Sequence, residues 1–404
     1  MNFFIYYLFI VLANSRFSRS ILMIFTMGSQ ISFLQFSVIQ MGYFASRFLF
    51  EFPSGVIADY IKRKYSLAFG NFLASLVAMT MFSTSIIHPK DTFIFFLLLF
   101  CLDGIASSFQ SGSDEALLYD YLLKKKQESR YAKILGWRSG IAALVLSIAT
   151  MIGGFMADSS LALPFLFQGI LSVAAGVVIL FFPENAMGSK NSKAKHTSPF
   201  KIAAEGFSVI KTIPLVQFLI LFITIISCST NAITMFMQGY FAELKISSGM
   251  VGIIYGVCTL FSTVAAINSH HLIKLSLKTI LILSTIMYFS GIVLLFTHNI
   301  PLVILGFFLI YIKLDLMEPS VFYFINQEVN DDVRATILSS FGASYSLVTL
   351  IMYPFYGLVG NSSGYQGIIL ITAVMTFPMF AYLFRFYKKY NVGVRAIVPR
   401  EVTK

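Results

Sequence analysis

The chain has 404 residues, of which 57% are hydrophobic and only 12% are charged, and its mean hydropathy is +0.81. A soluble protein of this length has about a quarter of its residues charged, so the composition excludes a protein surrounded by water alone and indicates an integral membrane protein. A net charge of +11 suggests nucleic acid as a ligand, but membrane topology explains the cations better and we expect no nucleic acid. The three cysteines lie in apolar segments, which indicates packing rather than disulfides or metal binding.

Twelve apolar segments are long enough to cross a bilayer as helices, since one crossing takes about 20 apolar residues. The N-terminal segment is interpreted as a retained first span, because no basic residue precedes it and no small-residue cleavage site is present. In chain order, the predicted spans are 4–27, 35–57, 66–87, 92–116, 133–156, 161–182, 214–240, 248–268, 277–297, 301–325, 335–358 and 365–386.

The basic residues are distributed unequally between the two sides of these spans. If the N-terminus is cytoplasmic, 23 of the 29 Lys and Arg residues lie in inner loops or in the C-terminal tail. Only Lys90 and Lys245 lie in outer loops. Because Lys and Arg concentrate on the cytoplasmic side, we expect both termini in the cytoplasm and a multi-pass protein of the plasma membrane.

One predicted loop, residues 183–213, is much longer and more polar than most others. We interpret it as a cytoplasmic linker between an N-terminal six-helix half (1–182) and a C-terminal half (214–404) that ends in a short basic tail. A shift of 203 residues aligns 131–160 with 334–363 at nine identities, which indicates an internal repeat. Parallel repeats of two six-helix halves occur in secondary transporters, with the binding site between the halves.

The second predicted span leads into FEFPSGVIADYIKRKY at 50–65. Its residues Gly55, Asp59, Arg63 and Lys64 match G-x-x-x-D-[RK]-x-G-[RK]-[RK], so the stretch resembles the loop motif of the major facilitator superfamily. The stretches SGSDEALLYDYL and RATILSSF are similar to a bacterial drug-efflux-type branch of permeases. The resemblance implies an all-α membrane protein with twelve transmembrane helices in two pseudo-symmetric halves, and a bacterial transporter.

The resemblance also implies a role for the loop aspartate. In the family it contacts the N-terminal end of helix 11 and latches the two halves together in the outward-facing state, where the helix dipole favours an anion. In this chain helix 11 is predicted to begin near Arg334, and Arg138 is a second candidate partner for Asp59. The cations Lys62–Lys64 are expected to meet anionic lipid headgroups.

Four departures from the family's patterns are visible. In the loop motif, Tyr60 replaces a basic residue and Lys62 replaces the second glycine. In the fifth predicted span, Val145 stands at the middle glycine of the family's antiporter pattern, and Ala149-Thr150 stands in place of its Gly-Pro. The incomplete antiporter pattern leaves uptake open as an alternative to export.

Charges inside the predicted spans are candidates for function, because a charged group in a bilayer is costly. They lie in helices 1, 2, 4 and 10, which in the family line the central cavity. Asp103, Asp315 and Glu318 are candidate proton-coupling or substrate carboxylates, since buried carboxyl groups can exchange protons near neutral pH. The candidate cavity cations are Arg16, Arg19, Arg47 and Lys313, and the candidate polar lining residues are Gln110, Asn231 and Gln238. Alternatively, the charges pair across helices and only hold the halves together.

These features predict a monomeric, proton-driven secondary transporter that exports a small amphipathic or drug-like molecule by alternating access. Proton-coupled uptake is one alternative, and a non-transporting sensor or scaffold with the same fold is another. No phosphate-binding loop or metal-ligand spacing is found in the sequence, so we expect neither an enzyme nor a metal or cofactor. Four predicted cavity cations against three carboxylates permit an anionic ligand without identifying the substrate.

Overall fold

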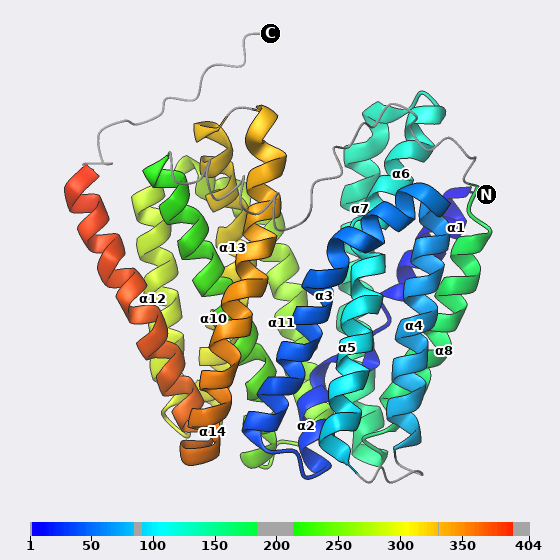
Figure 1. Ribbon diagram of the computed structural model, residues 1–404. Helices are drawn as coiled ribbons and strands as arrows, with labels where there is room; N and C mark the ends of the chain where they lie inside the picture. The colour runs from blue at the N-terminus through cyan, green and yellow to red at the C-terminus, as the bar shows by residue number, and fades with distance from the viewer. Residues whose placement is uncertain (1, 85–90, 184–212, 330, 391–404) are drawn as a thin grey trace.

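The computed structural model describes residues 2–84, 91–183, 213–329 and 331–390, and within these ranges the chain forms helices and no strand. The helices stand side by side in two groups, α1 to α8 and α10 to α14, with α3 and α11 near the boundary between them (Figure 1). The helices are α1 (Asn2–Ala13), α2 (Leu22–Gly28), α3 (Phe33–Ile61), α4 (Arg63–Ser83), α5 (Thr92–Gln110), α6 (Ser113–Lys124), α7 (Tyr131–Ser159), α8 (Leu163–Leu180), α10 (Pro214–Glu243), α11 (Ser248–Asn268), α12 (Leu277–Leu295), α13 (Ile300–Glu328) and α14 (Asp331–Tyr390).

The described helices supply twelve membrane crossings. Nine are long and apolar enough to span a bilayer, and the bent pair formed by α1 and α2 makes a tenth. Helix α3, with 29 residues, adds another. Helix α14 is two helices joined at Gly364, where the backbone has φ +60° and ψ −155°. This arrangement confirms the predicted fold class. The predicted linker at 183–213 lies almost wholly outside the described residues.

Most helix ends agree with the predicted spans to within a few residues, because the polar residues that interrupt the hydropathy also cap the helices. Ser32 begins α3 with a capping box, in which its hydroxyl accepts from the amide of Gln35 at 3.2 Å. Asp91 begins α5 by accepting from the amide of Ile94 at 3.1 Å. Pro214 occupies the first turn of α10, where no amide donor is required.

Two predicted spans differ from the structure. The segment predicted as one helix at 4–27 is broken between Ala13 and Leu22. The segment predicted at 92–116 turns at Ser111 and Gly112 and then continues as α6. Gly112 has φ +67°, a conformation that favours glycine. The residues at these breaks are polar, but the apolar residues on either side keep the mean hydropathy of each whole segment high enough for a span.

We call the end of the bundle with the turn at Lys62 the basic face and the other end, with the turns at 29–32 and 244–247, the opposite face (Figure 1). The two groups of helices touch from the middle of the bundle to the opposite face. There the amide of Leu34 in α3 donates to Asn361 Oδ1 in α14 at 3.2 Å. Toward the basic face the ribbons of the two groups lie apart (Figure 1).

Glycines allow the two groups of helices to approach closely toward the opposite face. Toward the basic face, a glycine of α7 has open space beside it. A Cβ on Gly154 of α7 would lie 2.7 Å from the Cα of Gly252 in α11, and one on Gly357 of α14 would lie 2.7 Å from the Cα of Leu34. Side chains at these positions would therefore push the helices apart. A Cβ on Gly140, nearer the basic face on α7, would meet no atom within 4 Å.

Candidate functional site

The break in the first span lies where the two halves meet. Asn14 Nδ2 and Ser15 Oγ donate to the carbonyl oxygens of Ile10 and Val11, each at 2.8 Å. Side chains that bond in this way compete with backbone amides for the last carbonyls of a helix. The backbone then leaves the helical region at Arg16, with φ −94° and ψ 83°. This local chemistry ends α1 and exposes Arg16.

Two glutamine side chains bond the backbone groups that the break leaves free. Gln168 Oε1 accepts from the amide of Ser18 at 3.2 Å and from its hydroxyl at 2.8 Å. Gln238 Oε1 accepts from the amide of Met23 at 2.8 Å, and its Nε2 donates to the carbonyl of Arg19 at 3.1 Å. Gln238 is 1% exposed. It joins α10 to the broken span and lines none of the three cavities, so its contacts are those of helix–helix hydrogen bonding, which the polar stripe on this span also permits, and not those of a cavity lining.

A cavity of 480 Å³ lies between the two halves and adjoins two smaller ones. The first smaller cavity, of 390 Å³, lies inside the N-terminal half, and the second, of 340 Å³, lies against α13. The charged and polar side chains that line the large cavity include Arg16, Arg19, Arg47, Asp103, Gln110, Asn231 and Tyr345. Most of the predicted site residues are thus brought together in one place.

The 340 Å³ cavity contains both carboxylates of α13, Asp315 and Glu318. They lie three positions apart, so they share one face of the helix. Asp315 accepts a hydrogen bond from Ser262, and Arg19 Nη2 donates to the hydroxyl of Tyr311 at 2.7 Å. In the part of the chain that the structure describes, no Lys or Arg forms an ion pair with Asp315 or Glu318. Both carboxyl groups are available to a proton or a ligand.

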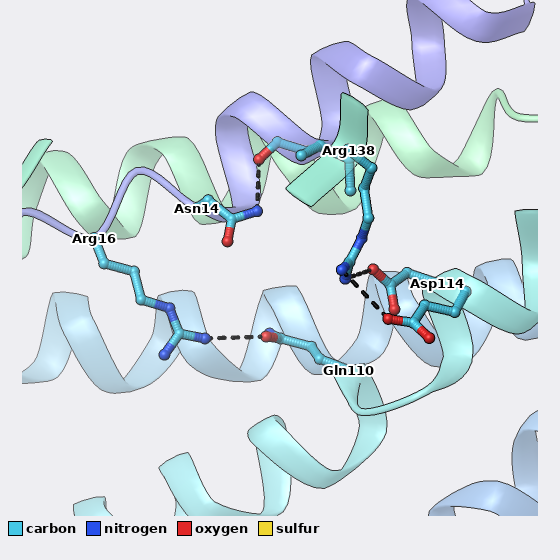
Figure 2. Close-up of polar contacts among 7 residues, drawn as sticks. Asn14, Arg16, Gln110, Asp114 and Arg138 are labelled. Atoms are coloured by element: carbon cyan, nitrogen blue, oxygen red, sulfur yellow. Dashed lines mark hydrogen bonds and ion pairs between the residues drawn. The ribbon is translucent and has the colours of Figure 1, made fainter. Parts of the chain in front are cut away.

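The N-terminal half contributes the third carboxylate and two arginines. Asp103 of α5 is within electrostatic range of Arg16, whose Nη2 donates to Gln110 Oε1 at 3.4 Å (Figure 2). Arg47 of α3 lines the 480 Å³ and the 390 Å³ cavities. Among the described residues, its guanidinium group has neither an ion-pair nor a hydrogen-bond partner.

Lys313 differs from the other candidate cations. Its side chain is 0% exposed, and its Nζ lies 4.2 Å from the ring centroid of Tyr288 and 3.5 Å from Thr230 Oγ1. It lines none of the three cavities, and no carboxylate of the described ranges pairs with it. An aromatic ring face attracts a cation, so Lys313 belongs to the packing of α10, α12 and α13. Helical spacing places Lys313 on another face of the helix than Asp315 and Glu318, but it does not identify the residues that it packs against.

The loop motif forms ion pairs at the basic face. Arg63 Nη2 lies 3.2 Å from Asp59 Oδ1, and its Nη1 lies 3.3 Å from Asp120 Oδ2 of α6. Lys64 Nζ donates to the carbonyl of Leu180 at 3.0 Å. Lys64 therefore caps the C-terminal end of α8, where a cation is favourable, rather than facing lipid headgroups as expected. Asp120 was not singled out from the sequence.

The prediction that Arg138 could bind Asp59 is wrong. Arg138 instead forms an ion pair with Asp114, and its Nη1 lies 3.3 Å from Glu115 Oε1 (Figure 2). Asp114 is 7% exposed, so the arginine supplies the counter-charge that a buried carboxylate requires. The side chain of Arg334, the other predicted partner of Asp59, lies outside the described residues.

The ion pair between Arg138 and Asp114 gives a stability prediction. Arg138→Gln is expected to destabilise the protein by about 3–5 kcal/mol, because Asp114 would keep a buried charge without a partner. Thermal unfolding of the purified protein in detergent measures the effect. The double variant with Asp114→Asn should recover part of the loss. If Arg138→Gln unfolds at the wild-type temperature, the pair does not stabilise the fold.

Lys62 occupies the position of the family's second glycine and has φ +90° and ψ 136°. A residue with a Cβ is strained in this region. Lys62→Gly is therefore expected to raise stability by about 1–2 kcal/mol, measured as a higher unfolding temperature. Lys125→Gly is the matched control, because Lys125 has φ −81° and no such strain. An equal or larger gain from the control would contradict this explanation.

Three tyrosines of the cavities were not predicted from the sequence. Tyr345 lines the 480 Å³ and the 340 Å³ cavities, and Tyr311 lines the latter. Tyr43 also lines the large cavity and donates to Ser107 Oγ at 3.2 Å. A tyrosine in an apolar segment is usually a packing residue, so the sequence contains little signal for these positions.

Comparison with known proteins assigns the family. The model of the Major Facilitator Superfamily matches residues 5–275 and 218–401, so the chain belongs to this superfamily. The match confirms the resemblance to this superfamily. It also confirms the prediction that the chain belongs to a family of transporters and not of enzymes. The drug-efflux branch remains a prediction.

Two curated relatives are MFS-type transporters of the archaeon Methanocaldococcus jannaschii, both described as uncharacterized. One is 28% identical over 132 residues, which are 33% of this chain and 31% of the relative. The other is 24% identical over 161 residues, or 40% of this chain and 39% of the relative. The matched segment thus spans less than half the length of either relative.

Several solved structures have the same fold. The nucleoside transporter NupG is similar with a TM-score of 0.76 at 13% identity, and the match covers 95% of this chain and 97% of that one. A D-xylose-proton symporter is similar with a TM-score of 0.70 at 11% identity, over 94% and 97%. At these identities the similarity concerns the fold and not the substrate.

Proposed function

We propose that the protein is a proton-coupled secondary transporter that moves a small amphipathic or drug-like molecule across the cell membrane by alternating access. The observation that carries the proposal is the 480 Å³ cavity between the two halves. The two halves that line it touch toward the opposite face, and in the described part of the chain no Lys or Arg forms an ion pair with the carboxylates of the C-terminal half in the adjoining cavity. A carboxyl group in this position can take up a proton from one side and release it to the other.

The distribution of basic residues supports an inner location for the basic face. With both termini in the cytoplasm, the cavity opens inward. Among the described side chains, Asp59 pairs with Arg63 of its own loop motif. We propose that the latch forms when the halves close at the basic face.

Export is the proposed direction, on the basis of the motifs shared with the drug-efflux-type branch. Uptake is the second candidate, and the form of α7 favours it. This helix runs from Tyr131 to Ser159 with no glycine at 145 and no Gly-Pro at 149–150. Thr150 Oγ1 instead bonds the carbonyl of Leu146 within the helix, at 2.6 Å. The helix thus lacks the feature typical of the family's antiporters.

Purified protein in liposomes, with an imposed pH gradient and a panel of compounds, tests the proposed function. We expect compound-dependent proton movement, followed by a pH-sensitive dye inside the vesicles, and none in protein-free vesicles. The side on which the compound accumulates separates export from uptake. Compounds that bind but never move, under any gradient, would instead support a sensor or scaffold.

The latch predicts a selective effect of Asp59→Asn. The Asp59 side chain is 57% exposed, so its ion pair contributes little to stability, about 0–1 kcal/mol. We expect normal insertion and unfolding temperature but a transport rate lower by about tenfold or more, because a lost charged contact of about 1.5–3 kcal/mol disfavours the closed basic face. Glu243→Gln, at an exposed position on the opposite face, is the control. Near-normal transport by Asp59→Asn would exclude the latch.

A further inference from the structure

We propose that the transported compound is an organic anion whose acidic group binds between Arg16 and Arg47. This inference depends on the proposed transport function, because it names the substrate class of the same cavity.

The cavity walls carry opposite charges in the two halves. In the C-terminal half, the charged side chains that line the described cavities are the carboxylates Asp315 and Glu318, and the cation that lines the 340 Å³ cavity with them, Arg19, comes from the N-terminal half. In the N-terminal half, three arginines line the 480 Å³ cavity together with one carboxylate, namely Arg16, Arg19, Arg47 and Asp103. A ligand in this cavity therefore meets a cationic wall on one side.

In the described part of the chain, two of these arginines have no carboxylate within ion-pair distance. Arg16 donates only to a neutral amide, Gln110, at 3.4 Å, and Arg47 has no partner among the described side chains. Arg138, which lines the 390 Å³ cavity as well, is by contrast paired with the two carboxylates of that cavity, Asp114 and Glu115. Uncompensated guanidinium groups in a membrane interior are costly. They are also suited to hold a carboxylate or phosphate by two parallel hydrogen bonds.

The permanence of these charges favours an anion over a cation as the ligand. An arginine side chain remains protonated in proteins, so Arg16 and Arg47 cannot lose their charge, and the one carboxylate of this wall, Asp103, does not balance its three arginines. Asp315 and Glu318 can be neutralised by a proton, and they need no cationic ligand. The arginines of the N-terminal wall therefore require an anionic ligand, whereas the carboxylates of the C-terminal wall do not require a cationic one.

Neutral hydrogen-bonding groups surround the same position. The 390 Å³ and 480 Å³ cavities share Arg16, Arg47, Asn14, Asn71, Ser107 and Gln110. The shared residues come from the break after α1 and from α3, α4 and α5, so they converge on the region where the cavities join. A cavity of 480 Å³ is within the range of about 300–1,000 Å³ that accommodates small organic ligands.

Three probes of one shape test the substrate class. They are phenyl phosphate or benzoate as the anion, benzamide as the neutral analogue and benzylamine as the cation. Each is titrated onto the full chain in detergent at low salt, and the unfolding temperature is recorded. We expect saturable stabilisation by the anions and none by the other two. Arg47→Gln and Arg16→Gln should each weaken anion binding about tenfold or more, because each removes charge-assisted hydrogen bonds.

Matched variants separate a lost contact from a damaged fold. Arg47→Lys keeps the charge and should retain part of the anion affinity, whereas Arg130→Gln makes the same change at an exposed position outside the cavities and should retain all of it. Gel filtration of each variant verifies folding. Stabilisation by benzylamine rather than by the anions, or no response to either anion, would overturn the proposal. So would anion binding that is unaffected by Arg47→Gln.

The failure of this inference is distinguishable from the failure of the proposed function. If the vesicle assay shows transport of neutral or cationic compounds only, transport stands and the anion proposal falls. If anions bind through Arg16 and Arg47 but no compound moves, the binding site stands and the transport function falls.

Discussion

Gly154→Leu is expected to abolish the state in which the cavity opens to the basic face, and with it transport. A Cβ at Gly154 would lie 2.5 Å from the carbonyl oxygen of Ser248 and 2.7 Å from the Cα of Gly252. Both partners are backbone atoms of α11, so no side-chain rotation relieves the clash. Overpacking of this kind costs about 1–3 kcal/mol, which shifts a two-state equilibrium by roughly 5- to 150-fold.

Gly140→Leu is the matched control on the same helix. A Cβ at Gly140 meets no atom within 4 Å in this state, so the variant should fold and keep the basic face open. Accessibility of an introduced cysteine on the cavity wall to a membrane-impermeant thiol reagent, in vesicles of known orientation, measures which side is open. Equal accessibility in the two variants would show that the contact between α7 and α11 does not control the opening.

The second large effect concerns the cavity carboxylates. Glu318→Gln is expected to abolish uphill transport driven by a pH gradient while leaving downhill movement of the compound, because an amide cannot carry the coupled proton. The single variants Asp315→Asn and Asp103→Asn show whether these carboxylates share the role of Glu318 in proton coupling. Flux in proteoliposomes with and without an imposed gradient is the measurement.

Glu243→Gln makes the same chemical change at an exposed position of α10 and should behave as the wild type. Gradient-driven flux that persists in all three cavity variants would exclude these carboxylates as coupling sites. Loss of downhill flux as well as uphill flux would instead indicate that the carboxylates bind the compound itself.

The fold could be predicted from the sequence because its signals are local. Apolar runs define the spans, and capping residues such as Ser32 and Asp91 define the helix starts. The break after Ala13 could not be predicted in this way. It depends on Gln168 and Gln238, which are distant in sequence and bond the backbone at the break.

Part of the candidate site could also be predicted from the sequence, because charged residues stand out within apolar spans. Charges within spans identify Arg16, Arg47, Asp103 and Glu318, since few other roles justify their cost in a bilayer. The sequence could not show that Lys313 is buried against an aromatic ring, because that ring belongs to Tyr288 of another helix.

The central claim is that two halves alternately close at the two faces around one cavity. Distances between spin labels on a variant without the native cysteines test it most directly. One pair, at Lys124 and Ile267, reports the basic face, and the other, at Ser160 and Glu243, reports the opposite face. The account predicts that a transported compound or Gly154→Leu shortens the first distance and lengthens the second. Distances that stay fixed, or that change in the same direction at both faces, would contradict it.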